Sequence, residues 1–149
     1  LVGEVTISEP YTVGGGDIHL VVLDLGMKGS ILCNLVSHGV RATVLPWNAT
    51  TEQILDLCPD GLFLSNGPGD PATLTETIDI VKSLIGKLPI CGICLGHQVI
   101  GLALGMETYK LKFGHHGGNH PVKDIARDRV FITSQNHNYA LKAGDVPDV

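Results

Sequence analysis

From residue 18 onward, hydrophobic runs of strand length alternate with stretches in which hydrophobic residues follow helical spacing. The pattern predicts strands at 19–25, 40–45, 61–64 and 88–93, and helices at 28–38, 50–57, 73–85 and 98–104. Thr50 and Gln53 have the spacing of a capping box, and Thr73 and Glu76 repeat that spacing. Because alternating strands and helices form right-handed βαβ units, we predict an α/β fold with a mostly parallel, doubly wound (flavodoxin-like) sheet and helices on both faces.

The pattern differs at the two ends of the chain. Residues 1–17 include a proline-containing stretch and a run of glycines at 14–16, which predict the end of a preceding domain plus a linker. The main domain is therefore expected over 18–149. After residue 105 the composition indicates short antiparallel strands at 106–113, 121–125 and 130–133.

Composition excludes several classes of function. The chain has 149 residues, a net charge of −5 and no cluster of Lys and Arg, so we expect neither nucleic-acid binding nor attachment to a membrane surface. No apolar run reaches the ~18–20 residues of a transmembrane helix, and no secretory signal is recognisable. The cysteines, at 33, 58, 91 and 94, do not suggest a disulfide framework, so a cytoplasmic location is expected.

The segment Gly92-Ile93-Cys94-Leu95-Gly96 has the form G-x-C-x-G and lies between a predicted strand and a predicted helix. This arrangement is typical of a nucleophile elbow, and a helix N-terminus favours the thiolate of a cysteine placed there. The pentapeptide alone fits a small buried thiol equally well. Its position at the carboxyl end of a strand favours a functional role, because ligands of parallel sheets bind at that edge.

A second unusual loop, Asn66-Gly67-Pro68-Gly69-Asp70-Pro71, follows the predicted strand at 61–64 and therefore ends at the same edge. Glycine and proline often make a simple tight turn, which is one interpretation. The other is that small residues let backbone N–H groups approach the oxyanion formed when a thiolate attacks a carboxamide. Loss of one such donor typically lowers the rate by ~10²–10³.

The sequence carries a set of motifs in a fixed order: S-N-G-P-G-D-P at 65–71, G-I-C-L-G-H-Q at 92–98, F-G-H-H-G-G-N-H-P-V at 113–122 and S-Q-N-H at 134–137. The first two resemble the class I (triad) glutamine amidotransferases. The last two narrow the resemblance to the glutamine-hydrolysing small-subunit family of carbamoyl-phosphate synthetases, or the matching domain of fused pyrimidine-pathway enzymes. The resemblance extends from about residue 4 to the C-terminus.

The resemblance implies that Cys94 attacks the γ-amide of L-glutamine and releases ammonia by way of a thioester. It further implies an oxyanion hole made by the N–H groups of Gly67 and Leu95. The glutamine-binding residues that it implies, some through their backbone, are Gly67, Gly69, Leu95, Gln98, Asn136, Asn138 and Tyr139. Asn138 and Tyr139 stand where the family carries Gly and Phe; asparagine tolerates the left-handed conformation, and Tyr139 keeps the ring.

The resemblance also implies a partner, a large synthetase subunit that uses ATP and magnesium for carbamoyl phosphate synthesis in arginine and pyrimidine pathways. No cofactor or metal site is expected in this chain. The family takes the triad's histidine and glutamate from a G-H-P-E segment, but no H-x-E occurs here, and His120-Pro121-Val122 lacks the carboxylate. We therefore expect a domain over 18–149 that is truncated at its C-terminus and inactive by itself.

Other interpretations remain open. The chain could be another class I amidotransferase, of the anthranilate or aminodeoxychorismate synthase type, although the motif at 113–122 argues against it, or a non-catalytic assembly module. Cys91 and Cys94 form a C-x-x-C pair, but the predicted helix begins after Cys94, which leaves Cys91 as a core side chain of the strand. Gly117 and Gly118 intervene between the histidines at 115–116 and the histidine at 120, and no cysteine or acidic ligand is nearby, so we expect a solvent-facing loop or a partner contact rather than zinc. His97 is expected to give structural support.

Overall fold

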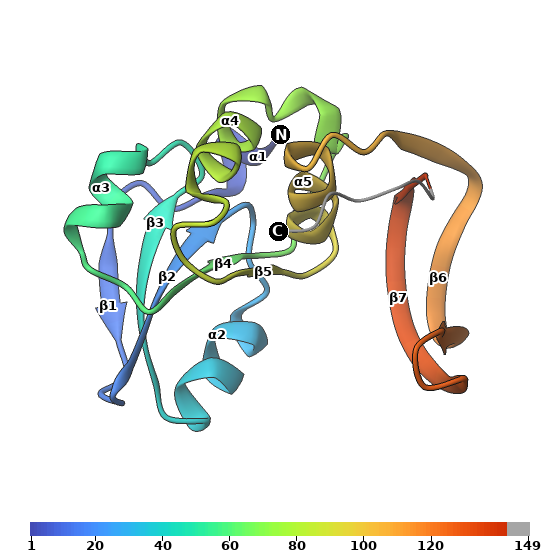
Figure 1. Ribbon diagram of the computed structural model, residues 1–149, viewed down its shortest axis with the longest axis horizontal. Helices are drawn as coiled ribbons and strands as arrows, with labels where there is room; N and C mark the ends of the chain where they lie inside the picture. The colour runs from blue at the N-terminus through green and yellow to red at the C-terminus, as the bar shows by residue number, and fades with distance from the viewer. Residues whose placement is uncertain (143–149) are drawn as a thin grey trace.

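The sheet at the centre of the molecule is built from the apolar runs of the first half of the chain. The computed structural model describes residues 1–142, and five strands form one sheet in the order β1-β3-β2-β4-β5 (Figure 1). The strands are β1 (Tyr11–Val13), β2 (Ile18–Asp24), β3 (Val40–Pro46), β4 (Gly61–Leu64) and β5 (Ile90–Gly92). Strands β2 to β5 are parallel, and β1 is antiparallel to β3. The prediction of an α/β fold with a mostly parallel sheet is confirmed.

Helices cover both faces of this sheet (Figure 1). On one face α2 (Gly29–Ser37) packs over Val22 and Phe63. On the other lie α1 (Val2–Val5), α3 (Thr51–Asp56), α4 (Thr75–Leu84) and α5 (Leu95–Ala103). Neighbouring residues of β2 alternate between the two cores, which is why this strand is apolar at consecutive positions. No helix in the described part of the chain is long and apolar enough to span a membrane.

The N-terminal segment lies against the edge of the sheet. Strand β1 pairs with β3, with Tyr11 opposite Val44, and the Ile7 N–H donates to Asp24 Oδ2 over 2.9 Å. Asp24 also accepts the N–H groups of Gly26 and Met27 at the carboxyl end of β2. Residues before position 18 therefore contribute to the sheet, and the division of the chain at that position stays a prediction.

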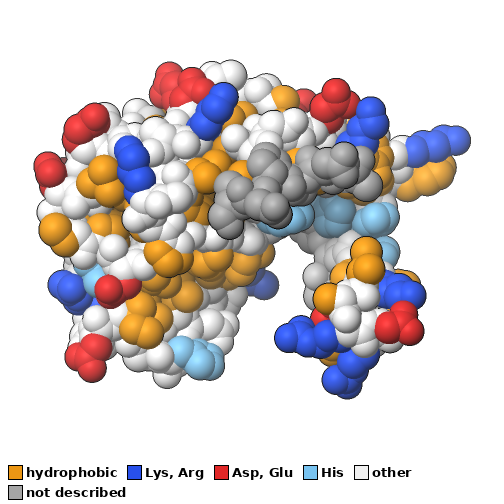
Figure 2. All heavy atoms as spheres, viewed as in Figure 1, with side chains coloured by type: hydrophobic (Ala, Val, Ile, Leu, Met, Phe, Trp, Pro, Cys, Tyr) orange, Lys and Arg blue, Asp and Glu red, His pale blue; other side chains and the backbone are white. Residues whose placement is uncertain are grey.

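The second half of the chain ends in a long antiparallel hairpin, made of β6 (Thr108–Asp124) and β7 (Arg129–Leu141). The prediction of antiparallel strands is confirmed, but their predicted short length is wrong, because the glycine-rich stretch is absorbed as irregularities in the β6–β7 register. The hairpin stands away from the sheet, with hydrophobic and basic side chains gathered at its far end (Figure 2). Ile125, in the turn of the hairpin, is 86% exposed, and Phe113, within β6, is 81% exposed.

The two capping predictions have different outcomes. The box at Thr50 is confirmed: its Oγ1 accepts the Gln53 N–H, and Gln53 Oε1 accepts the Thr50 N–H. The prediction for Thr73 is wrong, because α4 begins two residues later, after Leu74. Thr73 instead lies in a 3-10 turn (Pro71–Thr73) and donates to the Asp70 carbonyl oxygen over 2.7 Å. A proline at the first position lets this extra turn form in front of the helix.

We expect Thr50→Ala to lower the free energy of unfolding by about 1 kcal/mol, because the Gln53 N–H loses its acceptor. Thr75→Ala is the matched control: Thr75 begins α4, is exposed, and its side chain makes no hydrogen bond within residues 1–142. Urea denaturation of both variants measures the difference. Equal losses would contradict the assigned cap.

Candidate active site

The turn between β5 and α5 holds Cys94 in an unusual backbone conformation. Its φ is +54° and its ψ is −107°, and only two other non-glycine residues in the described range have positive φ, Cys58 and Asp128. Such a conformation costs of the order of 1–3 kcal/mol and persists only where the surroundings impose it. The turn is a strand–elbow–helix junction with the thiol at its apex.

The glycines of the G-x-C-x-G motif permit a close approach between the elbow and the end of β4. A Cβ on Gly96 would overlap the Leu64 carbonyl oxygen, and a Cβ on Gly92 would lie 2.6 Å from the carbonyl carbon of Gly96. Two hydrogen bonds hold this approach: the Ile93 N–H donates to Leu64 O over 3.1 Å, and the Gly96 N–H donates to Ser65 O over 3.2 Å. The backbone of β4 therefore fixes the elbow.

The loop at 65–71 is fixed in its turn by the loop that follows β2. The buried Ser65 Oγ accepts the Leu25 N–H over 2.9 Å and donates to the Asn66 carbonyl oxygen. Asn66 Oδ1 accepts the Lys28 N–H over 2.9 Å. Gly67 lies so close to this neighbouring loop that a Cβ there would overlap the Leu25 carbonyl oxygen. A glycine is therefore needed at position 67, because any side chain would clash with the loop after β2.

Cys94 opens into a cavity of about 230 Å³, which we call the inner cavity. All the residues that the sequence predicts for glutamine binding line it, together with Pro68 and His137: Gly67, Gly69, Leu95, Gln98, Asn136, Asn138 and Tyr139. They come from the loop after β4, from the start of α5 and from β7. The structure thus brings the predicted residues together, while their individual roles stay predictions.

Hydrogen bonds across the inner cavity join α5 to β7. The Cys94 thiol donates to the Asn136 carbonyl oxygen over 3.6 Å, and the buried Gln98 amide donates to the Tyr139 carbonyl oxygen. The Gly67 N–H has no acceptor within residues 1–142. Asn138 lies in the extended strand β7 and is not in the left-handed conformation, so that tolerance of asparagine is not used here.

His116 is a neighbour of the site that the sequence did not indicate. It lies in strand β6, not in a loop, and its ring nitrogens are 2.8 Å from Asn136 Oδ1 and 3.2 Å from Asn138 Oδ1. The run of histidines was the only sign in the sequence that a histidine lies near the site. Which of them contacts Asn136 and Asn138 depends on how β6 pairs with β7.

The histidines do not form a metal site. His115 packs on His120 and His137, and no group of His, Cys, Asp and Glu within the described residues could hold a metal ion.

Burial raises the pKa of the Cys94 thiol, and the Leu95 N–H partly opposes this effect. The helix terminus favours the thiolate, as expected from the sequence, but desolvation is the larger effect and favours the neutral thiol. The acceptor of the thiol's hydrogen bond is a backbone carbonyl, and no histidine ring or basic side chain bonds to the thiol within the described range. In this arrangement the thiol is the resting form.

Cys91 differs from its prediction. It is exposed: it shares the α2 face of the sheet with its partner Phe63, and the side chains that cover that core do not extend over β5, the last strand of the described sheet. Cys33, Cys58, Cys91 and Cys94 are all free. Cys94 and exposed His97 also line a larger hollow of about 740 Å³. The thiol thus borders both this hollow and the inner cavity.

Comparisons with known proteins agree with this geometry. The family model described as "Glutamine amidotransferase class-I" matches residues 21–149. A carbamoyl phosphate synthase small chain from Methanopyrus kandleri is 49% identical over 99% of this chain and 41% of its own length. The protein of that name from Akkermansia muciniphila is 53% identical over 92% of this chain and 37% of its own length. The chain thus spans about two-fifths of these relatives.

Solved structures show the same fold. A GMP synthase component from Thermoplasma acidophilum has a TM-score of 0.68 at 25% identity, with 88% of this chain and 69% of that chain covered. A glutamine amidotransferase from Thermotoga maritima has a TM-score of 0.63 at 17% identity, with 86% and 64% covered. The mostly parallel α/β arrangement is therefore shared with amidotransferase structures.

We expect Gly96→Ala to lower the free energy of unfolding by about 1–3 kcal/mol, because the new methyl group would overlap the Leu64 carbonyl oxygen. Gly29→Ala is the control: Gly29 lies in the first turn of α2, as Gly96 does in α5, but its added Cβ would meet no atom within 4 Å. This control should be neutral or stabilising by about 0.4–1 kcal/mol. Denaturant titration distinguishes the two, and equal effects would contradict the close approach.

We expect the alkylation rate of Cys94 to rise with pH through a midpoint above the ~8.5 of a free cysteine, because only the thiolate reacts and burial raises its pKa. The measurement uses iodoacetamide on a chain in which Cys33, Cys58 and Cys91 are replaced by serine. The same chain unfolded in urea should give the reference value. A folded midpoint below that reference would contradict the dominance of burial.

Proposed function

The chain belongs to the class I glutamine amidotransferase family, and we propose that it forms the glutaminase part of a carbamoyl-phosphate synthetase. The observation that carries this proposal is the convergence of Cys94, the loop at 67–69 and residues 136–139 on one cavity. Relatives about half identical to the chain bear the name of that enzyme's small chain and support the narrower assignment. The substrate in this proposal is L-glutamine.

In the proposed reaction Cys94 Sγ attacks the γ-carboxamide carbon of glutamine. A carbon–sulfur bond forms, the carbonyl electrons move to the oxygen, and the resulting oxyanion accepts hydrogen bonds from the Gly67 and Leu95 N–H groups. Ammonia then leaves with the thiol's proton, and water hydrolyses the thioester to glutamate. Each N–H donor contributes a factor of ~10²–10³ to the rate. The strained elbow supports this role by holding Sγ at the cavity wall.

Proton transfer needs a base, because burial keeps Cys94 in its thiol form. No histidine with a carboxylate partner contacts Sγ within residues 1–142. We infer that the histidine and glutamate of the triad come from outside the described residues, and that residues 1–149 alone do not turn over glutamine. The same observation favours the second candidate function, a non-catalytic assembly module.

We further propose the wider context that the family implies. The ammonia passes to a large synthetase subunit that holds ATP and magnesium, and the domain over 18–149 is doubly wound. Its parallel strands have the order β3-β2-β4-β5, which is the start of a flavodoxin-like arrangement and supports this part of the proposal. The free cysteines support a reducing, cytoplasmic environment.

We expect a diazo-ketone analogue of glutamine to label Cys94 covalently in the parent protein, because the cavity presents this thiol to the electrophilic carbon. Peptide mass spectrometry locates the label. Cys91→Ser is the matched control and should label normally, whereas Cys94→Ser should not label. A label on Cys91, or none in the unaltered protein, would contradict the assignment of the nucleophile and favour the assembly module.

A further inference from the structure

The carboxylate of Asp24, the last residue of β2, is buried and holds two separate segments of backbone. Its Oδ1 accepts the N–H groups of Gly26 and Met27 over 3.0 and 2.7 Å. Its Oδ2 accepts the Ile7 N–H over 2.9 Å. Because Asp24 takes part in no ion pair within residues 1–142, backbone N–H groups replace the water that this carboxylate loses on burial.

The first of these segments is the loop after β2 (25–28), against which the loop at 65–69 packs. Asn66 joins the two loops: its amide nitrogen donates to the Gly26 carbonyl oxygen over 3.3 Å, and its Oδ1 accepts a backbone N–H of the same loop. Gly67 lies directly against a carbonyl oxygen of this loop, with no room for a Cβ. A displacement of the loop after β2 would therefore displace Gly67.

Gly26 is the point at which the loop after β2 meets both of its neighbours. Its φ is +110°, which favours glycine. A Cβ at this position would lie 2.8 Å from Val5 Cγ2 and 3.0 Å from Pro68 Cδ. The loop after β2 is therefore in contact with the start of the chain on one side and with the loop at 65–69 on the other.

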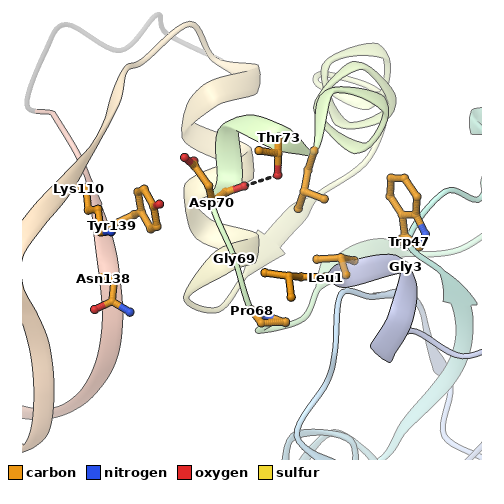
Figure 3. Close-up of a pocket in the computed structure, with 12 residues that line it drawn as sticks. Leu1, Gly3, Trp47, Pro68, Gly69, Asp70, Thr73, Lys110, Asn138 and Tyr139 are labelled. Carbon is orange, nitrogen blue, oxygen red and sulfur yellow. Dashed lines mark hydrogen bonds between the residues drawn. The ribbon is translucent and has the colours of Figure 1, made fainter.

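The second segment that Asp24 holds is the N-terminal one, at 1–7. The Thr6 hydroxyl donates to the Asp24 carbonyl oxygen over 2.7 Å, which anchors this segment beside the buried carboxylate. Leu1, at its other end, has its Cδ1 3.5 Å from where a Cβ on Gly69 would stand. Figure 3 shows both residues in the wall of a pocket of about 680 Å³. Both segments that Asp24 holds thus contact the loop after β4.

We propose that Asp24 is a positioning residue for the oxyanion hole, because it fixes the two segments against which the loop that carries Gly67 is packed. The proposal rests on the proposed function, in which the Gly67 N–H donates to the oxyanion. Asp24 does not line the inner cavity and acts only through these segments. A backbone donor must lie about 2.7–3.1 Å from the developing oxyanion, so a small displacement of its loop lowers the rate.

The test compares three variants of the parent protein. Asp24→Asn keeps the shape of the side chain but leaves one acceptor oxygen, so it cannot bind both segments. Gly26→Ala leaves Asp24 intact and displaces the loop after β2, because the new methyl group would lie 3.0 Å from Pro68 Cδ. Asp60→Asn is the matched control: the Asp60 carboxylate accepts the His19 N–H over 2.7 Å at the opposite end of β2.

We expect Asp24→Asn and Gly26→Ala to lower kcat for ammonia release from glutamine about tenfold, a part of the ~10²–10³ that a whole donor contributes. KM should stay within about twofold, since an oxyanion donor acts only in the transition state. Alkylation of Cys94 by iodoacetamide, followed by peptide mass spectrometry, should keep its rate, because that reaction forms no oxyanion. Asp60→Asn should change none of these values. Urea denaturation gives the folded fraction of each variant, to which the rates are normalised.

An unchanged kcat in either folded variant would overturn the positioning role. A fall in the alkylation rate parallel to that in kcat would overturn it too, because it indicates a general disruption of the site. If Asp24→Asn does not fold, Gly26→Ala decides alone. If the unaltered parent releases ammonia from glutamine, the proposed function survives all of these results. If it releases none, both the positioning role and the proposed function are contradicted.

Discussion

The close approach of the elbow to the end of β4 is the constraint on which the rest of the site depends. Gly96 can lie against the Leu64 carbonyl only because it has no side chain, and the Gly96 N–H then bonds to Ser65. This contact holds Cys94 at a φ that non-glycine residues rarely adopt. It also joins the two loops that line the inner cavity, so the thiol and the loop at 67–69 are positioned by one piece of backbone packing.

The same packing sets the chemistry of the thiol. A sulfur placed in a cavity wall is partly withdrawn from water, which raises the pKa of Cys94 despite its position at a helix N-terminus. Helix-terminal N–H groups stabilise a thiolate by a limited amount, and here desolvation is the larger effect. The site therefore holds a thiol in a cavity wall, but within the described residues it holds no group that bonds to the thiol as a base. In the proposed function, a histidine with a carboxylate partner from outside the described residues would take the proton that burial keeps on the Cys94 sulfur.

The sequence predicted those parts of the fold in which local pattern and tertiary environment agree. Strand β4 lies where its apolar run predicted, and the elbow follows from its glycines. The predictions failed where pairing between distant segments decides the structure. The hairpin joins segments that look separate along the chain, because strand pairing tolerates the irregularities near Gly117. Cys91 is exposed because the burial of a strand side chain depends on what covers its face of the sheet, and the described residues that cover the α2 face do not extend over β5.

Backbone groups of β7, and not its side chains, bond to the elbow and to α5 in the described part of the chain. Across the inner cavity the contacts from β7 to α5 are made by the backbone carbonyls of Asn136 and Tyr139. Any residue supplies a carbonyl, so strand geometry, and not residue type, preserves these bonds. Asn138 accordingly needs no left-handed conformation. The side chains at these positions make other contacts: Asn136 and Asn138 bond to His116, and the Tyr139 phenol faces Asp70.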